Sequence, residues 1–60
     1  MTMVLPKDPV MLLSVVNTEL RDHYSSLTEL AKAYGVAEQE IKDQLALIKY
    51  EYQPEVNQFR

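Results

Sequence analysis

The sequence predicts a mainly α fold in which three helices are followed by a short β-hairpin at the carboxyl end. Apolar residues recur at helical spacing in three successive stretches, and residues that favour helix ends separate these stretches. After Tyr50 the pattern changes to the alternation of a strand. Sixty residues without a cysteine predict a single domain, residues 1–60, that is held together by packing or association and not by disulfides.

The first helix is predicted over residues 8–23. Asp8 is a good N-cap, and Pro9 suits the first helical position, where a missing N–H costs nothing. Four apolar residues fall on one face of this helix and should form the main part of the core: Leu12, Leu13, Val16 and Leu20. Polar residues then bring the helix to its end near His23.

The second helix is predicted over 26–34 and the third over 38–48. Ser26 and Glu29 have the spacing of a capping box, and Gly35 supplies the left-handed conformation that ends the second helix. Glu38 and Glu40 suit the positive end of the third helix dipole. Its buried face should consist of Ile41, Leu45 and Ile48.

Residues 50–60 are predicted to form the hairpin. Pro54 can open a type I turn, and Asn57 tolerates the left-handed conformation that closes a four-residue loop. The resulting register sets Tyr52 opposite Phe59 and pairs Glu51 with Arg60. An irregular tail is the alternative, and Val4 with Leu5 could add a third strand.

Two resemblances refine this prediction. The stretch Leu30-Ala31, Tyr34-Gly35-Val36 and Ile41 resembles the core of helix-turn-helix proteins, although Gln44 stands where such motifs have an aliphatic residue. The resemblance implies a helix-turn-helix-like three-helix bundle with the hairpin as a miniature wing. Nearly the whole chain is also similar to a family of small bacterial proteins known only as a domain of unknown function. This similarity rests on Leu5-Pro6-Lys7-Asp8-Pro9, Met11-Leu12-Leu13-Ser14, Val16-Asn17, Leu20-Arg21-Asp22, Tyr24-Ser25-Ser26-Leu27, Tyr50-Glu51-Tyr52 and Asn57-Gln58-Phe59.

Catalysis and cofactor binding have little basis in the sequence. Ser25 and Ser26 lie close to His23, but no orienting carboxylate or oxyanion site accompanies them, so we expect no enzyme and no small-molecule substrate. The carboxylates of the third helix are spread along it, which favours a solvated face over a metal site. The apolar stretch 10–16 is too short to span a bilayer, so we expect a cytoplasmic protein with no membrane partner.

The favoured functional hypothesis is a protein-interaction or self-association module. Met11 and Val15 form an apolar stripe on the first helix away from its main face, and Val10 lies on yet another side. Leu47 could extend this surface. A protein partner or a second copy of the chain would cover it.

The alternative hypothesis is DNA binding by the third helix. Gln39, Lys42 and Gln44 would contact base edges, and Lys49 would lie near phosphates together with Lys32 and Arg60. A formal net charge of −3 opposes contact with a polyanion, as do the carboxylates in the first turn of the helix. The charge therefore favours the interaction hypothesis.

Overall fold

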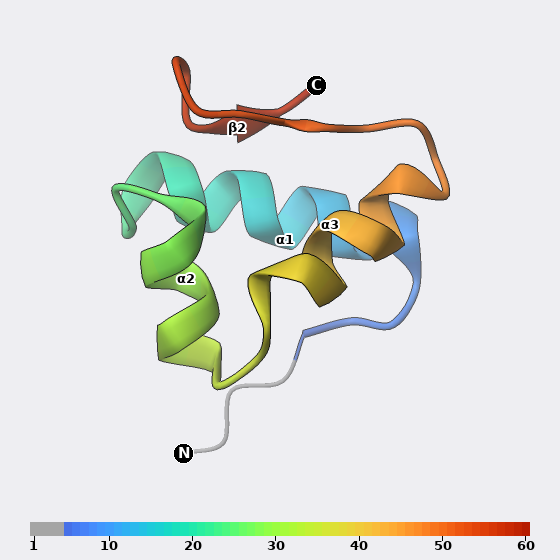
Figure 1. Ribbon diagram of the computed structural model, residues 1–60, viewed down its shortest axis with the longest axis horizontal. Coiled ribbons are helices and arrows are strands. Elements are labelled where there is room, and N and C mark those ends of the chain that lie inside the picture. The colour runs from blue at the N-terminus through green and yellow to red at the C-terminus, as the bar shows by residue number, and fades with distance from the viewer. Residues whose placement is uncertain (1–4) are drawn as a thin grey trace.

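The computed structural model describes residues 5–60, which contain three helices and a two-stranded antiparallel sheet. The elements in chain order are α1 (Pro9–Asp22), α2 (Leu27–Tyr34), α3 (Glu38–Ala46), β1 (Tyr52–Gln53) and β2 (Gln58–Phe59). α1 contacts both other helices and β2, and the hairpin runs along it in Figure 1. The predicted fold class, mainly α with a short carboxyl-terminal hairpin, is confirmed.

The hydrophobic core lies where the three helices and the hairpin meet. It consists of the buried side chains Leu12, Val16, Leu20, Leu27, Leu30, Ala31, Ile41, Leu45 and Phe59. Burying one large aliphatic or aromatic side chain contributes about 1.5–3 kcal/mol to folding. Among residues 5–60, Phe59 is the one core member from outside the helices, so the core needs the hairpin for completion.

Side chains and a tight turn cap the helices as the local sequence predicts. The Asp8 carboxylate accepts a hydrogen bond from the Met11 amide at 3.4 Å, and the Ser26 hydroxyl accepts one from the Glu29 amide at 3.2 Å. The other half of the capping box, in which the Ser26 amide would donate to the Glu29 carboxylate, is not formed within residues 5–60. Gly35 is left-handed, with φ of 68°.

α3 ends differently from the prediction of a helix over 38–48. Its α-helical part stops at Ala46, and the last turn tightens as the amide of Ile48 donates to the carbonyl of Leu45 at 3.2 Å. Lys49 then adopts a left-handed φ of 65°. The Tyr50 amide donates back to the carbonyl of Leu45 at 3.0 Å. This bond and the one that the Lys49 amide donates to the carbonyl of Ala46, also at 3.0 Å, form a Schellman motif with a lysine in the place that glycine usually takes.

The hairpin has the predicted register. Tyr52 pairs with Phe59, and Glu51 and Arg60 exchange backbone hydrogen bonds of 3.0 and 2.9 Å. Asn57 is left-handed with φ of 54°, as the turn requires. These findings exclude the irregular tail. The third strand is not formed at Leu5, which packs against the core, and Val4 lies outside the described residues.

Candidate interaction surfaces

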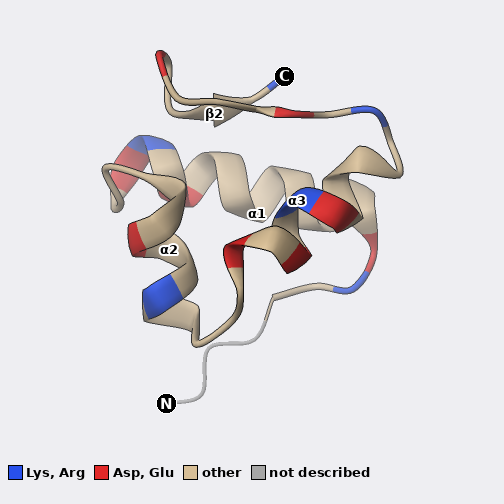
Figure 2. Ribbon diagram, in the orientation of Figure 1, with Lys and Arg blue, Asp and Glu red and all other residues tan. Residues whose placement is uncertain are grey.

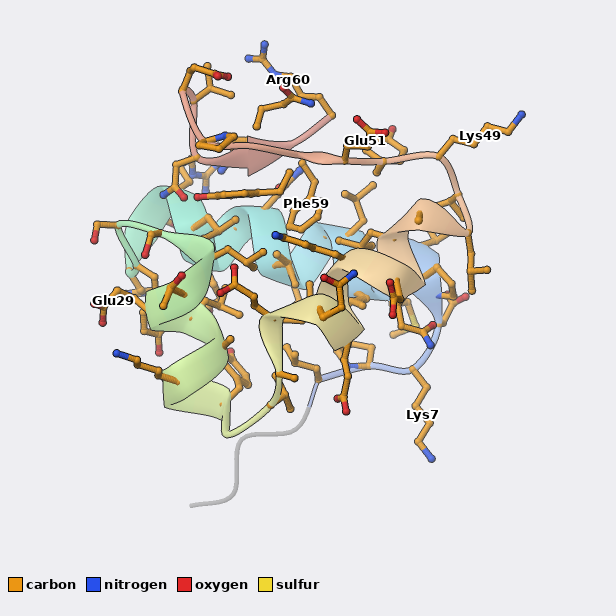
Figure 3. The ribbon with its side chains drawn as sticks, in the orientation of Figure 1. Lys7, Glu29, Lys49, Glu51, Phe59 and Arg60 are labelled. Carbon is orange, nitrogen blue, oxygen red and sulfur yellow. The ribbon has the colours of Figure 1, made fainter. Side chains whose placement is uncertain are left out.

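Side-chain amides fasten the hairpin to α1. The Asn17 Nδ2 donates to the carbonyl of Phe59 at 3.1 Å, and its Oδ1 accepts from the Phe59 amide at 2.8 Å. The Gln58 Nε2 donates to the carbonyl of Asn17 at 3.0 Å. Figure 3 shows Phe59 pointing from the hairpin toward the helices. Asn17 therefore closes the outer edge of β2 in the way that a neighbouring strand would.

A second polar cluster joins the hairpin to the corner between α1 and α2. The Asn57 Nδ2 donates to the carbonyls of Leu20 and Tyr24, each at 3.0 Å. Its Oδ1 accepts from the Tyr52 hydroxyl at 2.7 Å, and that hydroxyl accepts from the Leu27 amide at 3.2 Å. These groups cap the end of α1 and the start of α2. Because the Asn57 amide and the Tyr52 hydroxyl are engaged in these hydrogen bonds, we assign both side chains a structural role.

Exposed apolar side chains gather at two helix ends. Val10 and Met11, in the first turn of α1, are 62% and 59% exposed, and Leu47, just after α3, is 70% exposed. The start of α1 and the end of α3 lie at the same end of the molecule in Figure 1. We call Val10, Met11 and Leu47 the apolar end.

Val15 departs from the exposure expected for the predicted stripe. Its side chain is half-buried, whereas Met11 is exposed. Val15 is three residues from the buried Leu12, which places it nearer in helical angle to the core face than Met11. Val15 therefore borders the core, and the exposed part of the stripe is Met11.

Two of the proposed DNA-contacting residues on α3 are engaged with carboxylates of the same helix. The Gln39 Nε2 donates to Asp43 Oδ1 at 2.8 Å, and the Lys42 Nζ lies 3.8 Å from Glu38 Oε2. Glu38 is held further by the Thr28 hydroxyl, which donates to its Oε1 at 3.1 Å.

The remaining DNA-contacting candidates lie apart from these side chains. Gln44 is exposed on α3, and Lys49 extends from the turn beyond that helix (Figure 3). Figure 2 shows basic residues scattered over several elements and acidic residues along α3. The described residues thus present no continuous basic face around this helix.

A groove opens beside α3 that the sequence reasoning missed. Its volume is about 540 Å³, and its lining comes from four parts of the chain, namely the segment before α1, α1, the turn after α2, and α3: Leu5, Pro6, Lys7, Leu12, Val36, Glu40, Ile41, Asp43 and Gln44. Leu12 and Ile41 are buried and form its floor. No periodicity in a single segment reveals a surface of this kind, because separate segments supply its walls.

Other polar groups offer no assembled catalytic or metal centre within residues 5–60. No group of three or more potential metal ligands gathers there. Ser26 caps α2, and His23 lies edge-on to the Tyr24 ring at 6.5 Å. Burial and the charge of Glu19 raise the pKa of Tyr34, while a hydrogen bond from Arg21 lowers the pKa of Asp22. None of the helices described has the length and apolarity that crossing a bilayer requires.

Comparison with known proteins identifies a family without an assigned activity. No curated protein and no solved structure matches the chain. A family model described as "Domain of unknown function (DUF4250)" matches residues 6–59. Several residues that carry the sequence resemblance, among them Asn17, Tyr52 and Asn57, are those that fasten the hairpin to the helices. The chain belongs to this DUF4250 family, which confirms the resemblance seen in the sequence.

Proposed function

We propose that this protein is a self-association module whose apolar end faces a second copy of the chain. The observation that carries the proposal is the exposure of Val10, Met11 and Leu47, each of which is more than half exposed. Removing apolar surface from water contributes about 25 cal/mol per Å². The chain is also short, and small domains bury a low fraction of their surface when they fold alone. Association would therefore add apolar burial that the monomer lacks.

A two-fold dimer is the simplest arrangement for this surface. In such a dimer the same patch occurs on both sides of the interface, so a single self-complementary surface is covered completely. Val10 and Met11 come from α1 and Leu47 from the end of α3, so that each copy would contribute two elements. A separate protein partner at this surface is the other form of the interaction hypothesis.

DNA binding by α3 is the less favoured hypothesis. The chain has a net charge of −3, and Gln39 and Lys42 are engaged with Asp43 and Glu38. Contact with phosphates or bases would require these side chains to leave their carboxylates, which would themselves face a polyanion. No observation on the described residues favours this function over self-association.

Sedimentation velocity from low to high micromolar concentration tests the proposal. We expect the wild type to sediment as a dimer at the highest concentrations. Met11→Lys/Leu47→Lys should remain a monomer, because the interface would bury lysine charges that have no acidic partner. Ala33→Lys/Val56→Lys is the matched control, because it adds the same charge at exposed apolar residues of α2 and the hairpin turn.

Circular dichroism should show that both variants keep the helical content of the wild type. A wild type that is monomeric throughout the concentration range would rule out the homodimer and leave a separate partner. Equal loss of association in both double variants would show that charge, and not the apolar end, controls it.

A further inference from the structure

We propose that the groove beside α3 receives an apolar side chain of a partner polypeptide, and that a lysine or arginine of the same segment meets Glu40 and Asp43. This inference goes beyond self-association, because it concerns other residues and a different kind of partner. It rests on three features of the groove: its apolar floor, the charge of its rim and its open shape.

The floor offers a site for an apolar group. Leu5, Pro6 and Val36 line the groove around the buried Leu12 and Ile41. A volume of about 540 Å³ lies within the range of about 300–1,000 Å³ that ligand pockets in proteins have. A large aliphatic or aromatic side chain therefore fits the groove and would displace water from apolar surface.

The position of Val36 in the wall of the groove is fixed by the turn that ends α2. The Val36 amide donates to the carbonyl of Ala31 at 3.0 Å, and the Gly35 amide donates to that of Lys32 at 3.2 Å. A preformed wall lowers the entropic cost of binding, because little of the protein must be ordered when the partner arrives.

The rim is acidic along α3. Glu40 and Asp43 are exposed residues three positions apart, which places them on the same side of the helix. The ion pairs within residues 5–60 are Arg21 with Asp22 and Lys42 with Glu38, so neither rim carboxylate is neutralised by one. Asp43 accepts one hydrogen bond, from Gln39 to its Oδ1.

Lys7, the basic residue of the lining, forms an ion pair with neither rim carboxylate within residues 5–60. Lys7 extends away from the body of the protein in Figure 3. The rim therefore complements a cation that stands beside an apolar group, and like charges would be repelled from it.

The shape of the groove favours a side chain on a polypeptide over a free small molecule. Pockets for small molecules bury about 70–90% of the ligand surface, and this requires walls on most sides. Here the groove is open to solvent along α3. A side chain presented by a polypeptide needs only one end to be covered, and its flanking residues can reach the rim.

Titration with capped tetrapeptides, followed by NMR, tests this proposal. The probe is acetyl-Lys-Leu-Phe-Lys-amide, and the control peptide is acetyl-Glu-Leu-Phe-Glu-amide. We expect the lysine peptide to shift the methyl signals of Leu12, Val36 and Ile41, and the glutamate peptide to leave them in place. Higher salt should weaken binding, because the rim charges are exposed.

Paired variants test the role of the rim. Glu40→Gln/Asp43→Asn should raise the dissociation constant about fivefold, the combined effect expected of two exposed ion pairs. Glu29→Gln/Glu55→Gln is the matched control, since it removes the same charge from exposed residues outside the groove. The control should change the dissociation constant by less than about twofold. Thermal midpoints should show that both double variants remain folded.

Several results would overturn the proposal. They are the absence of binding, equal binding of both peptides, equal weakening by both double variants, or signal shifts at Val10, Met11 and Leu47 in place of the groove. A chain lacking residues 1–4 provides one more test, because Leu5 lines the groove. Binding that occurs only after this deletion would assign the groove to the chain's own first residues. The mass in solution is a separate measurement, so self-association and the groove succeed or fail independently.

Discussion

Gly35 and Lys49 end two helices with the same pattern of backbone hydrogen bonds. Each is left-handed, with φ of 68° and 65°, and the residue after each donates back into the helix. Glycine adopts this conformation freely, whereas a residue with a Cβ is strained by about 1–2 kcal/mol. A Cβ at Gly35 would meet no atom within 4 Å, so the cost of replacing it comes from the backbone alone.

Substitutions at these two positions should change stability in opposite directions. Lys49→Gly should raise the free energy of unfolding by about 0.5–1 kcal/mol, less than the full strain because glycine also loosens the unfolded chain. Gly35→Ala should lower it by about 1 kcal/mol. Urea denaturation of both variants checks this. A loss of stability in Lys49→Gly would mean that its side chain makes contacts that outweigh the strain.

At the scale of elements, the hairpin depends on the helices for its stability and in turn supplies a core side chain and capping hydrogen bonds to them. An isolated two-stranded hairpin is at best marginally stable in water. Here Phe59 enters the core, Asn17 covers the edge of β2, and Asn57 caps the end of α1. The hydroxyl of Tyr52 joins this cluster to the first amide of α2. The hairpin and the α1–α2 corner should therefore unfold together.

Removing the Tyr52 hydroxyl tests this coupling. Tyr52→Phe deprives the part-buried Leu27 amide and Asn57 Oδ1 of their partner and should cost about 1–3 kcal/mol of stability. Hydrogen exchange at the Leu27 amide should become faster. Tyr50→Phe is the control; Tyr50 is 36% exposed, and the change should stay within about 0.5 kcal/mol. Equal effects of the two variants would contradict the capping role of Tyr52.

At the scale of the whole molecule, charge and exposed apolar surface bear on the choice of partner. The protein has a net charge of −3, and its basic residues are scattered over several elements (Figure 2). Nonspecific DNA affinity comes mainly from clustered basic residues that release counterions. The apolar end and the groove offer surfaces that do not depend on such a cluster.

Binding to random-sequence duplex DNA should therefore be undetectable at about 0.15 M salt. Fluorescence anisotropy with a labelled duplex checks this, with salt varied across the titration. Micromolar binding that falls steeply as salt rises would contradict the expectation and return α3 to consideration as a DNA-contacting helix.

The sequence by itself determined the features that depend on neighbouring residues. The N-caps Asp8 and Ser26, the left-handed Gly35 and the turn at Asn57 follow from the conformational preferences of those residues and of the few beside them. The hairpin register follows from turn length and from alternation along the strands. Helical spacing also identified most of the core, because burial repeats with the period of the helix.

Only the tertiary structure decided the features that join distant segments. Asn17 meets Phe59 across 42 positions of the chain, and Tyr52 caps Leu27 across 25. The groove exists because Leu5, Val36 and Ile41 approach one another. Such contacts depend on how the helices and hairpin are placed in space, which no local preference specifies. The candidate surfaces thus follow from packing, whereas the elements that carry them follow from the sequence.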